Sequence, residues 1–214
     1  RQKKRIVIAG SHGKTTTTAM VLHVMKYCNM NADFMVGARL EGFDLMVRLT
    51  EDADIMVFEG DEYLTSPLDR RPKFVHYRAH AAVINGIAWD HINVFPTEKI
   101  YHQQFEMLLD SMEPNGRLFW FREDEVLKRM VKNYKHKLNC SPFGVHQYKT
   151  DGDNAFVLDA GNRPHPVQFF GHHNMQNLEA ARLICLDAGI GEDDFYAAIQ
   201  TFKGASGRLQ LLTK

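Results

Sequence analysis

The stretch that decides the fold is "RIVIAGSHGKTTTTAMVLHVM", residues 5–25. Its apolar run, residues 5–9, predicts a short buried strand, and four turn residues, 10–13, follow it. An apolar-periodic segment from Lys14 to about residue 25 then predicts a helix. A strand, a glycine-containing loop, a Lys-Thr pair and a helix, in this order, are typical of a phosphate-binding loop.

The residues of this loop suit a nucleotide phosphate. Glycine lets the backbone approach a phosphate closely, and the N–H groups at a helix start bind anions. We expect Lys14 to reach the β- and γ-phosphates and the Thr15 hydroxyl to ligate Mg²⁺. The expected nucleotide-binding residues of the loop are Gly10, Ser11, His12, Gly13, Lys14, Thr15 and Thr16. His12 either contacts phosphate or only shapes the loop.

The loop departs from the Walker pattern G-x-x-x-x-G-K-[ST], because Ile8 stands where the first glycine belongs. Taken alone, the motif therefore leaves open a tight turn followed by a chance Lys-Thr pair.

The composition narrows the class of protein. The chain has 214 residues, 44% of them hydrophobic, which allows one domain or at most two with a substantial core. Lys plus Arg and Asp plus Glu both number 26, so no basic excess indicates nucleic-acid binding. No apolar run approaches about 18 residues, so no membrane span is expected. Three scattered cysteines without metal spacing suit a reducing, cytoplasmic location.

The alternation of short apolar runs with helical periods predicts an α/β fold, with a P-loop NTPase-like, mostly parallel sheet flanked by helices. Buried strands are expected at 54–60 and 81–87, and another strand within 115–121. Helices are expected at 97–111, 174–190 and 193–202, the first with Ile100, Phe105, Leu108 and Leu109 facing inward. Residues 136–170, rich in Gly, Asn and Pro, predict a small antiparallel β patch.

Two later motifs follow predicted strands. "FEGDE" supplies Glu59, Asp61 and Glu62, of which Glu59 is best placed to complete the Mg²⁺ site, unless the segment is only an exposed acidic turn. "INGIAWDH" places Asn85 at a strand end and His91 in the loop that follows. Ligands bind at the carboxyl ends of strands in open α/β sheets, so His91 is a candidate for a second metal or for phosphate, although such a residue can also be structural.

"GHHNMQN", residues 171–177, is the third candidate. Asn174 and Asn177 are three residues apart at a helix start and share a face. Amide side chains both donate and accept, which suits an adenine edge. Capping of the helix by Asn174 is the alternative.

These pieces together resemble the central domain of the ATP-dependent Mur ligase family. That family's loop reads G-[TS]-x-G-K-[ST] without the outer Walker glycine, and "GSHGKTTTT" fits this variant. The motifs E-x-D-E, N-x-x-x-x-D-H and G-x-H-N-x-x-N follow in the family's order, and an arginine lies near the domain end. The resemblance covers essentially the whole chain.

The resemblance implies a ligase that uses ATP and Mg²⁺. A muramate carboxylate would attack the γ-phosphate, and a peptide amine would then attack the resulting acyl phosphate. By similarity Lys14, Glu59 and His91 are the catalytic residues, and Thr15, Glu59 and His91 are the metal ligands. By the same similarity, His173, Asn174 and Asn177 are expected near the adenine. Arg208 is expected near the phosphates.

Within the family, residues 60–95 are similar to the murein peptide ligases. These join UDP-N-acetylmuramate to recycled L-alanyl-γ-D-glutamyl-meso-diaminopimelate, and "KFVHYR", residues 73–78, favours them over the UDP-N-acetylmuramate–L-alanine ligases. An ATP-binding module without chemistry is a further alternative. A P-loop kinase or GTPase is disfavoured, because the chain lacks an N-K-x-D motif and carries "GHHNMQN".

Some positions depart from the family's pattern. D-H-x-D ends here in Asn93, and the end motif, "SGRLQ", has a single arginine, Arg208. No lysine follows the D-H motif where several relatives carry a carbamylated one, and the resemblance makes Glu106, near that place, a candidate for the same metal-bridging role.

The resemblance also implies a domain organisation. We expect residues 1–214 to be a central ATP-binding domain excised from a longer ligase, without its N-terminal UDP-binding and C-terminal domains. Those domains, UDP-N-acetylmuramate and a peptide amine are the expected partners, and the isolated domain should have little ligase activity.

Overall fold

The strand that precedes the phosphate loop lies at the centre of the sheet. β1 (Lys4–Ala9) pairs in parallel with β4 (Ile55–Glu59) on one side and with β5 (Ala81–Ile84) on the other. In the computed structural model, which describes residues 3–204, seven strands follow the order β3-β2-β4-β1-β5-β6-β7. Within this sheet, as the described residues form it, only the β2–β3 pair is antiparallel. The remaining strands are β2 (Ala32–Met35), β3 (Val47–Arg48), β6 (Arg117–Phe121) and β7 (Asn139–Phe143).

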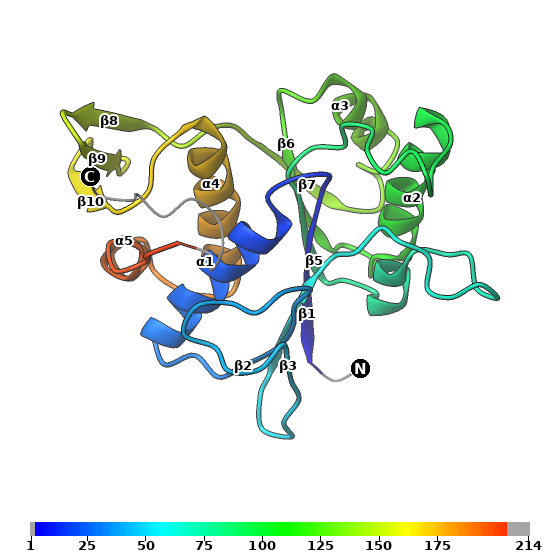
Figure 1. The fold of residues 1–214 in the computed structure, drawn as a ribbon, viewed down its shortest axis with the longest axis horizontal. Coiled ribbons are helices and arrows are strands. Elements are labelled where there is room, and N and C mark those ends of the chain that lie inside the picture. Colours follow the sequence, from blue (N-terminus) through cyan, green and yellow to red (C-terminus); the bar gives the residue numbers. More distant parts are fainter. Residues whose placement is uncertain (1–2, 205–214) are drawn as a thin grey trace.

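Helices cover both faces of this sheet (Figure 1). One face carries α1 (Lys14–Tyr27), α4 (His172–Asp187) and α5 (Glu192–Ile199), and the other carries α2 (Glu98–Ser111) and α3 (Glu125–Lys132). In β1 the side chains alternate between the two cores: Ile6 and Ile8 pack on the α1 side, and Val7 and Ala9 on the α2 side. A parallel strand covered on both faces has to be apolar throughout, which explains the run in the sequence. The predicted α/β fold is confirmed.

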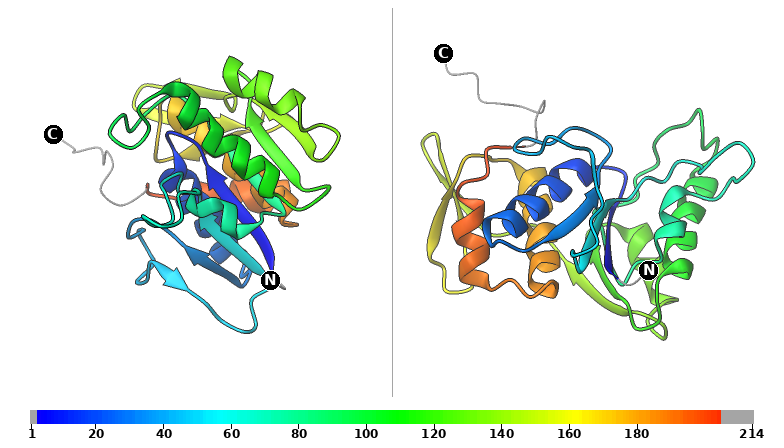
Figure 2. Two further views of the ribbon diagram at one scale, coloured as in Figure 1. Left: turned by 90° about the vertical axis from the view of Figure 1, so that its right-hand side faces the viewer. Right: turned by 90° about the horizontal axis from the view of Figure 1, so that it is seen from below.

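The predicted antiparallel patch is confirmed as a three-stranded sheet, β8 (Tyr148–Asp151), β9 (Asn154–Leu158) and β10 (Pro164–Val167). It lies beyond α5, apart from the main sheet (Figures 1 and 2). The prediction was wrong for residues 139–143, which form β7 of the main sheet and not a strand of the patch. Their polar, proline-containing sequence is tolerated because β7 is an edge strand.

The helix expected at 97–111 begins one residue later, and Thr97 caps it by accepting a hydrogen bond from the Ile100 N–H. The inward positions were predicted correctly for Phe105, Leu108 and Leu109, which are buried. The prediction for Ile100 was wrong, because its side chain is 39% exposed and Tyr101 takes the buried position. Tyr101, Phe105 and Leu108 share one face at the i, i+4, i+7 spacing. No helix within residues 3–204 has the length and apolar character needed to cross a membrane.

Candidate nucleotide-binding site

The topology brings two strand ends to the start of the loop. The Gly60 N–H donates to the Ile8 carbonyl (2.7 Å), and the Asn85 N–H donates to the Ala9 carbonyl (3.0 Å). The ends of β4 and β5 therefore flank the end of β1. In an open α/β sheet this is the edge where ligands bind.

The loop has the conformation that its glycines allow. Gly10 and Gly13 have φ angles of 132° and 78°. A Cβ on Gly10 would lie 2.9 Å from the Asn85 nitrogen, and one on Gly13 would lie 2.1 Å from Asn177 Oδ1. Both positions therefore need glycine. Ser11 fixes the loop from the other side, because its N–H donates to the Gly86 carbonyl (2.9 Å) and its hydroxyl to the Ala88 carbonyl (2.6 Å).

The start of α1 offers free backbone donors. The Thr17 N–H donates to the Gly13 carbonyl (2.9 Å), which places Gly13 at the cap of the helix. The N–H groups of Lys14, Thr15 and Thr16 precede this bond and point out of the helix end. No acidic residue lies in the first turn to compete for them. This arrangement suits an anion such as a phosphate.

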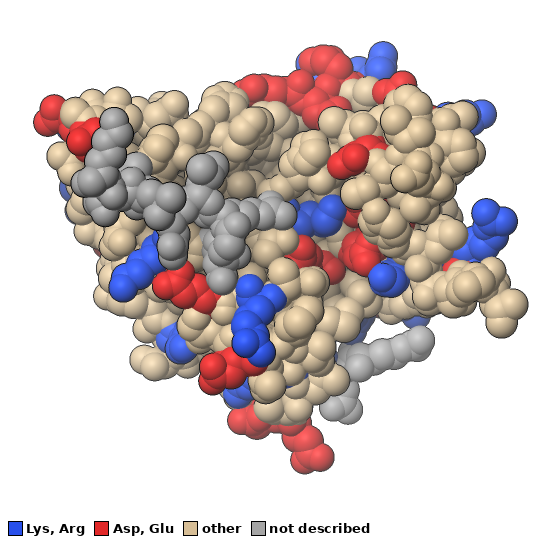
Figure 3. All heavy atoms as spheres, in the orientation of Figure 1, with Lys and Arg blue, Asp and Glu red and all other residues tan. Residues whose placement is uncertain are grey.

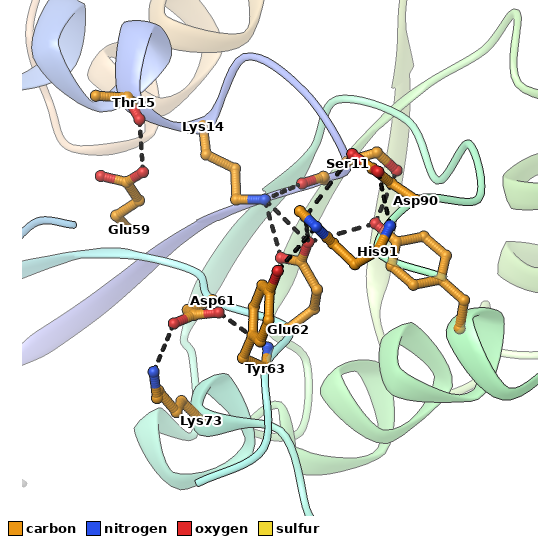
Figure 4. Close-up of polar contacts among 12 residues, drawn as sticks. Ser11, Lys14, Thr15, Glu59, Asp61, Glu62, Tyr63, Lys73, Asp90 and His91 are labelled. Carbon is orange, nitrogen blue, oxygen red and sulfur yellow. Dashed lines mark hydrogen bonds and ion pairs between the residues drawn. The ribbon is translucent and has the colours of Figure 1, made fainter. Parts of the chain in front are cut away.

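Lys14 is held by a buried carboxylate (Figure 4). Its Nζ donates to the Gly10 carbonyl (2.7 Å) and forms an ion pair with Glu62 Oε2 (2.9 Å). Glu62 is fully buried. Tyr101 approaches both sides of this cluster, because its hydroxyl donates to Ser11 Oγ (3.0 Å) and lies 3.4 Å from Glu62 Oε1. Burial raises the pKa of Tyr101 well above its usual range, which keeps this donor protonated.

Thr15 and Glu59 lie next to each other, as their expected role requires. The Thr15 hydroxyl donates to Glu59 Oε1 (2.7 Å), and Glu59 Oε2 accepts from the Gly37 N–H (2.9 Å). A hydroxyl and a carboxylate are hard oxygen ligands of the kind that Mg²⁺ takes together with phosphates, and here they lie beside the backbone donors at the start of α1. The residues present therefore fit a magnesium ion bound with a nucleotide.

His91 joins the Lys14 cluster through Glu62. Its Nδ1 hydrogen-bonds with the Tyr63 hydroxyl (2.8 Å), and its Nε2 lies 3.6 Å from Glu62 Oε1 and 3.7 Å from Asp90 Oδ2. Among residues 3–204, no group of three or more His, Cys, Asp or Glu side chains is arranged to hold a metal by itself. A metal at His91 stays a prediction.

Two positions at which the sequence departs from the family's pattern, Glu106 and Asn93, lie away from the loop cluster. Glu106 is exposed and lines a separate depression on α2 with Glu98 and His102, so it does not approach the loop. Asn93 is exposed in the turn after His91.

A cavity of about 480 Å³ opens between the loop and α4. Ser11, His12 and Gly13 form one wall, and α4 forms the other. The volume lies in the range of small-molecule pockets and suits a nucleoside. The other lining residues are Asn85, Gly86, Ala88, Phe121, Glu123, Asp124, His173, Gln176 and Asn177.

The residues expected at the adenine separate into two groups. His173 and Asn177 line the cavity, but Asn174 does not. The Asn174 amide donates to the Phe170 carbonyl (2.8 Å), and the cap position of α4 is Gly171, so the capping alternative for Asn174 was wrong. Arg208, with the rest of its "SGRLQ" motif, lies outside the described residues.

Charges of both signs are interspersed on the face shown in Figure 3, without a broad region of one sign. This agrees with the formal charge of zero and with the absence of a basic excess.

The family model of the Mur ligase middle domain matches residues 8–185, which include the loop, Glu59, His91 and the start of α4. The chain belongs to the Mur ligase family. The fold and the order of the motifs agree with this assignment.

Curated Mur ligases are similar over nearly the whole chain. The UDP-N-acetylmuramate–L-alanyl-γ-D-glutamyl-meso-2,6-diaminoheptandioate ligase of Escherichia coli is 30% identical over 99% of the chain and 48% of its own length. A UDP-N-acetylmuramate–L-alanine ligase of Arthrobacter is 26% identical over 96% of the chain and 44% of its own length. The chain thus spans about half the length of the curated relatives it matches.

Solved Mur ligase structures share the fold. The UDP-N-acetylmuramate:L-alanyl-γ-D-glutamyl-meso-diaminopimelate ligase of Neisseria meningitides superposes with a TM-score of 0.80 at 26% identity, covering 94% of this chain and 67% of that one. MurF of Acinetobacter baumannii, at 20% identity, also gives a TM-score of 0.80, covering 100% of this chain and 49% of that one.

Proposed function

We propose that this chain binds ATP with Mg²⁺ and is the nucleotide-binding part of a ligase that joins an amine to the carboxyl group of UDP-N-acetylmuramate. One observation carries the proposal. Lys14 and the Thr15–Glu59 pair meet at the open start of α1, beside a cavity of nucleoside size.

The chain's own residues have distinct tasks in this proposal. Lys14 and the first N–H groups of α1 hold the phosphates and offset their charge. Thr15 and Glu59 hold the metal, and His173 faces the base in the cavity. ATP, when bound, supplies the phosphoryl group that activates a carboxylate for amide formation. Positioning and charge neutralisation are the contributions that the protein makes to such a transfer.

For the amine substrate we propose the tripeptide L-alanyl-γ-D-glutamyl-meso-diaminopimelate, and hence a cytoplasmic role in peptidoglycan recycling. The name of the 30%-identical E. coli relative and that of the Neisseria structure support this choice. The L-alanine ligases, at 26% identity, give the alternative acceptor. Because the relatives are about twice as long, we propose that UDP-binding and C-terminal domains act together with this part of the ligase.

Calorimetry of ATP binding with and without Mg²⁺ tests the nucleotide site. We expect Lys14→Ala to lose at least tenfold in affinity, because a cation at the phosphates is removed. Lys26→Ala is the matched control, since Lys26 lies at the other end of α1, where it donates to the Gly42 carbonyl and lies over the Phe43 ring, away from the loop. If the unchanged chain binds no ATP, the proposal is wrong.

The acceptor is tested with the ligase that contains this chain. UDP-N-acetylmuramate, ATP and either the tripeptide or L-alanine are supplied, and amide product is measured. If kcat/KM is higher for L-alanine than for the tripeptide, the proposed acceptor is wrong and L-alanine is the acceptor.

A further inference from the structure

We propose that Tyr63 is a positioning residue for His91. Its hydroxyl holds the imidazole so that Nε2 faces the Lys14–Glu62 pair, where the phosphates of the nucleotide are expected. The inference rests on the ATP binding proposed above. Tyr63 is not among the residues that the sequence motifs place at the site.

The imidazole of His91 is held at one nitrogen and presents the other (Figure 4). Nδ1 hydrogen-bonds with the Tyr63 hydroxyl (2.8 Å). Nε2 lies 3.6 Å from Glu62 Oε1 and 3.7 Å from Asp90 Oδ2, beyond hydrogen-bond distance of either oxygen. Because a hydroxyl both donates and accepts, Tyr63 can bind Nδ1 whichever ring nitrogen carries the hydrogen. The contact therefore selects an orientation of the ring.

The backbone of His91 is fixed as well. Its φ angle is 59°, in the left-handed region that residues other than glycine seldom adopt. Its carbonyl accepts from the N–H groups of Val94 (2.8 Å) and Phe95 (2.9 Å). Such conformations persist where surrounding contacts impose them, and they are concentrated at functional sites. The backbone thus sets where the side chain begins, and Tyr63 sets where the ring points.

Tyr63 is itself held in place. Its N–H donates to Asp61 Oδ1 (2.9 Å), and its carbonyl accepts from the Lys73 N–H (3.0 Å). Its ring meets the Phe95 ring edge to face, with centroids 6.2 Å apart. The protein therefore determines where the hydroxyl lies. Without that hydroxyl, the imidazole loses its partner at Nδ1 and can rotate, so that Nε2 no longer faces the Lys14–Glu62 pair.

Tyr63→Phe tests the contact directly, because it removes the hydroxyl and keeps the ring. We expect the ¹⁵N NMR signal of His91 Nδ1, identified by its loss in His91→Ala, to shift in this variant. The reason is that a hydrogen bond at a ring nitrogen changes its shielding. Tyr134→Phe is the matched control, since that hydroxyl donates to the Glu106 carbonyl (3.3 Å) away from the loop. An unmoved signal in Tyr63→Phe would overturn the inference.

A double-mutant cycle tests whether Tyr63 acts through His91. By calorimetry of this chain, we expect Tyr63→Phe to weaken Mg²⁺-ATP binding about fivefold, as the loss of one hydrogen bond does. His91→Ala should weaken it at least as much, and adding Tyr63→Phe to His91→Ala should cause no further loss. Tyr134→Phe should stay within about twofold of the unchanged chain. A role of Tyr63 in stability alone would not depend on His91 in this way.

Three results of the binding measurements would overturn the inference. A further fivefold loss in the double variant would show that Tyr63 acts independently of His91. Unchanged affinity in His91→Ala would show that the imidazole does not contact the ligand. Mg²⁺-tripolyphosphate should lose affinity by the same factor as Mg²⁺-ATP, and a loss for ATP alone would place the contact at the base.

Failure of the proposed function gives a different result. In that case the unchanged chain binds neither ATP nor tripolyphosphate. The NMR comparison of Tyr63→Phe with Tyr134→Phe needs no ligand and still decides whether Tyr63 holds His91.

Discussion

Two buried polar clusters in this molecule differ in what lies beside them, one at the loop and the other between α4, α5 and the segment after β7. In the first, Lys14 and Glu62 pair beside the unoccupied donors at the start of α1. In the second, which we call the α4 cluster, Glu179 accepts from Nε and Nη2 of Arg182 (2.9 and 2.7 Å) and hydrogen-bonds with His146 Nδ1 (2.6 Å). Both clusters are buried and contain paired charges. The Lys14 cluster differs because the free backbone donors at the start of α1 lie beside it, and these donors are what a phosphate needs.

The α4 cluster connects α4 to the end of the main sheet and to α5. Burial raises the pKa of Glu179, but the hydrogen bonds from His146 and Arg182 outweigh it and hold that pKa below its usual range. The same pairing raises the pKa of Arg182. The cluster favours its charged state in the folded protein and therefore acts on stability.

The strongest test of this contrast is Glu179→Ala. It leaves Arg182 and His146 without their shared carboxylate, and we expect the free energy of unfolding to fall by about 3 kcal/mol. Urea unfolding measures this, and the affinity of the folded protein for ATP should stay within about twofold. Glu192→Ala is the control: this carboxylate, 48% exposed, also pairs with Arg182 but should cost less than about 1 kcal/mol. Equal costs would show that the α4 cluster is no more stabilising than a surface pair.

At the loop, Glu59→Gln should change the affinity for the ligand, whereas Glu179→Ala changes stability. The amide keeps the shape but is a poor metal ligand, so we expect Mg²⁺-ATP affinity to fall about twentyfold, or somewhat under 2 kcal/mol. Affinity for ATP without Mg²⁺ should change little, as calorimetry would show. Glu106→Gln, at an exposed carboxylate on α2 that lines a separate depression, should leave both affinities unchanged. If the affinity for ATP falls equally with and without Mg²⁺, Glu59 is not a metal ligand.

The α4 cluster also predicts a pH dependence. Because the pKa of Glu179 is lower in the folded chain than its ordinary value of 4.5, its stabilising effect is complete above that value and is lost as the pH falls through the folded pKa. The stability difference between the unchanged chain and Glu179→Gln should therefore narrow below pH 4.5. Urea midpoints from pH 7 to pH 3 measure it, and a constant difference would contradict the assignment.

The smallest expected effect is that of Tyr101→Phe. It removes the hydroxyl that donates to Ser11, and we expect about 1 kcal/mol less stability and about threefold weaker ATP binding. Tyr148→Phe, on the exposed strand β8, is the control and should change neither. Unchanged stability in Tyr101→Phe would mean that this contact does not support the loop.

The sequence predicted the central sheet, the loop and the Thr15–Glu59 pair, because each depends on a local pattern. An apolar run, a glycine turn and a carboxylate just after a strand can be recognised without knowing what lies next to them. β7 was missed because an edge strand needs no apolar run.

The partners inside the site were harder to predict. Tyr101 is 90 residues from Ser11, and Asn177 is 92 residues from Asn85. Contacts of this range are set by the order of strands in the sheet, and no local pattern contains them. A buried tyrosine does indicate that its hydroxyl has a partner, but not which one.

The central position of β1 in the sheet determines how its amide hydrogens exchange with solvent. Its backbone is bonded to β4 on one side and to β5 on the other, and both of its faces are covered. The amide hydrogens of such a strand exchange with solvent only through the largest openings of the molecule. The loop follows this strand directly. The amide hydrogens of β1 should therefore be among the last in the chain to exchange, after those of the edge strands and of the small sheet.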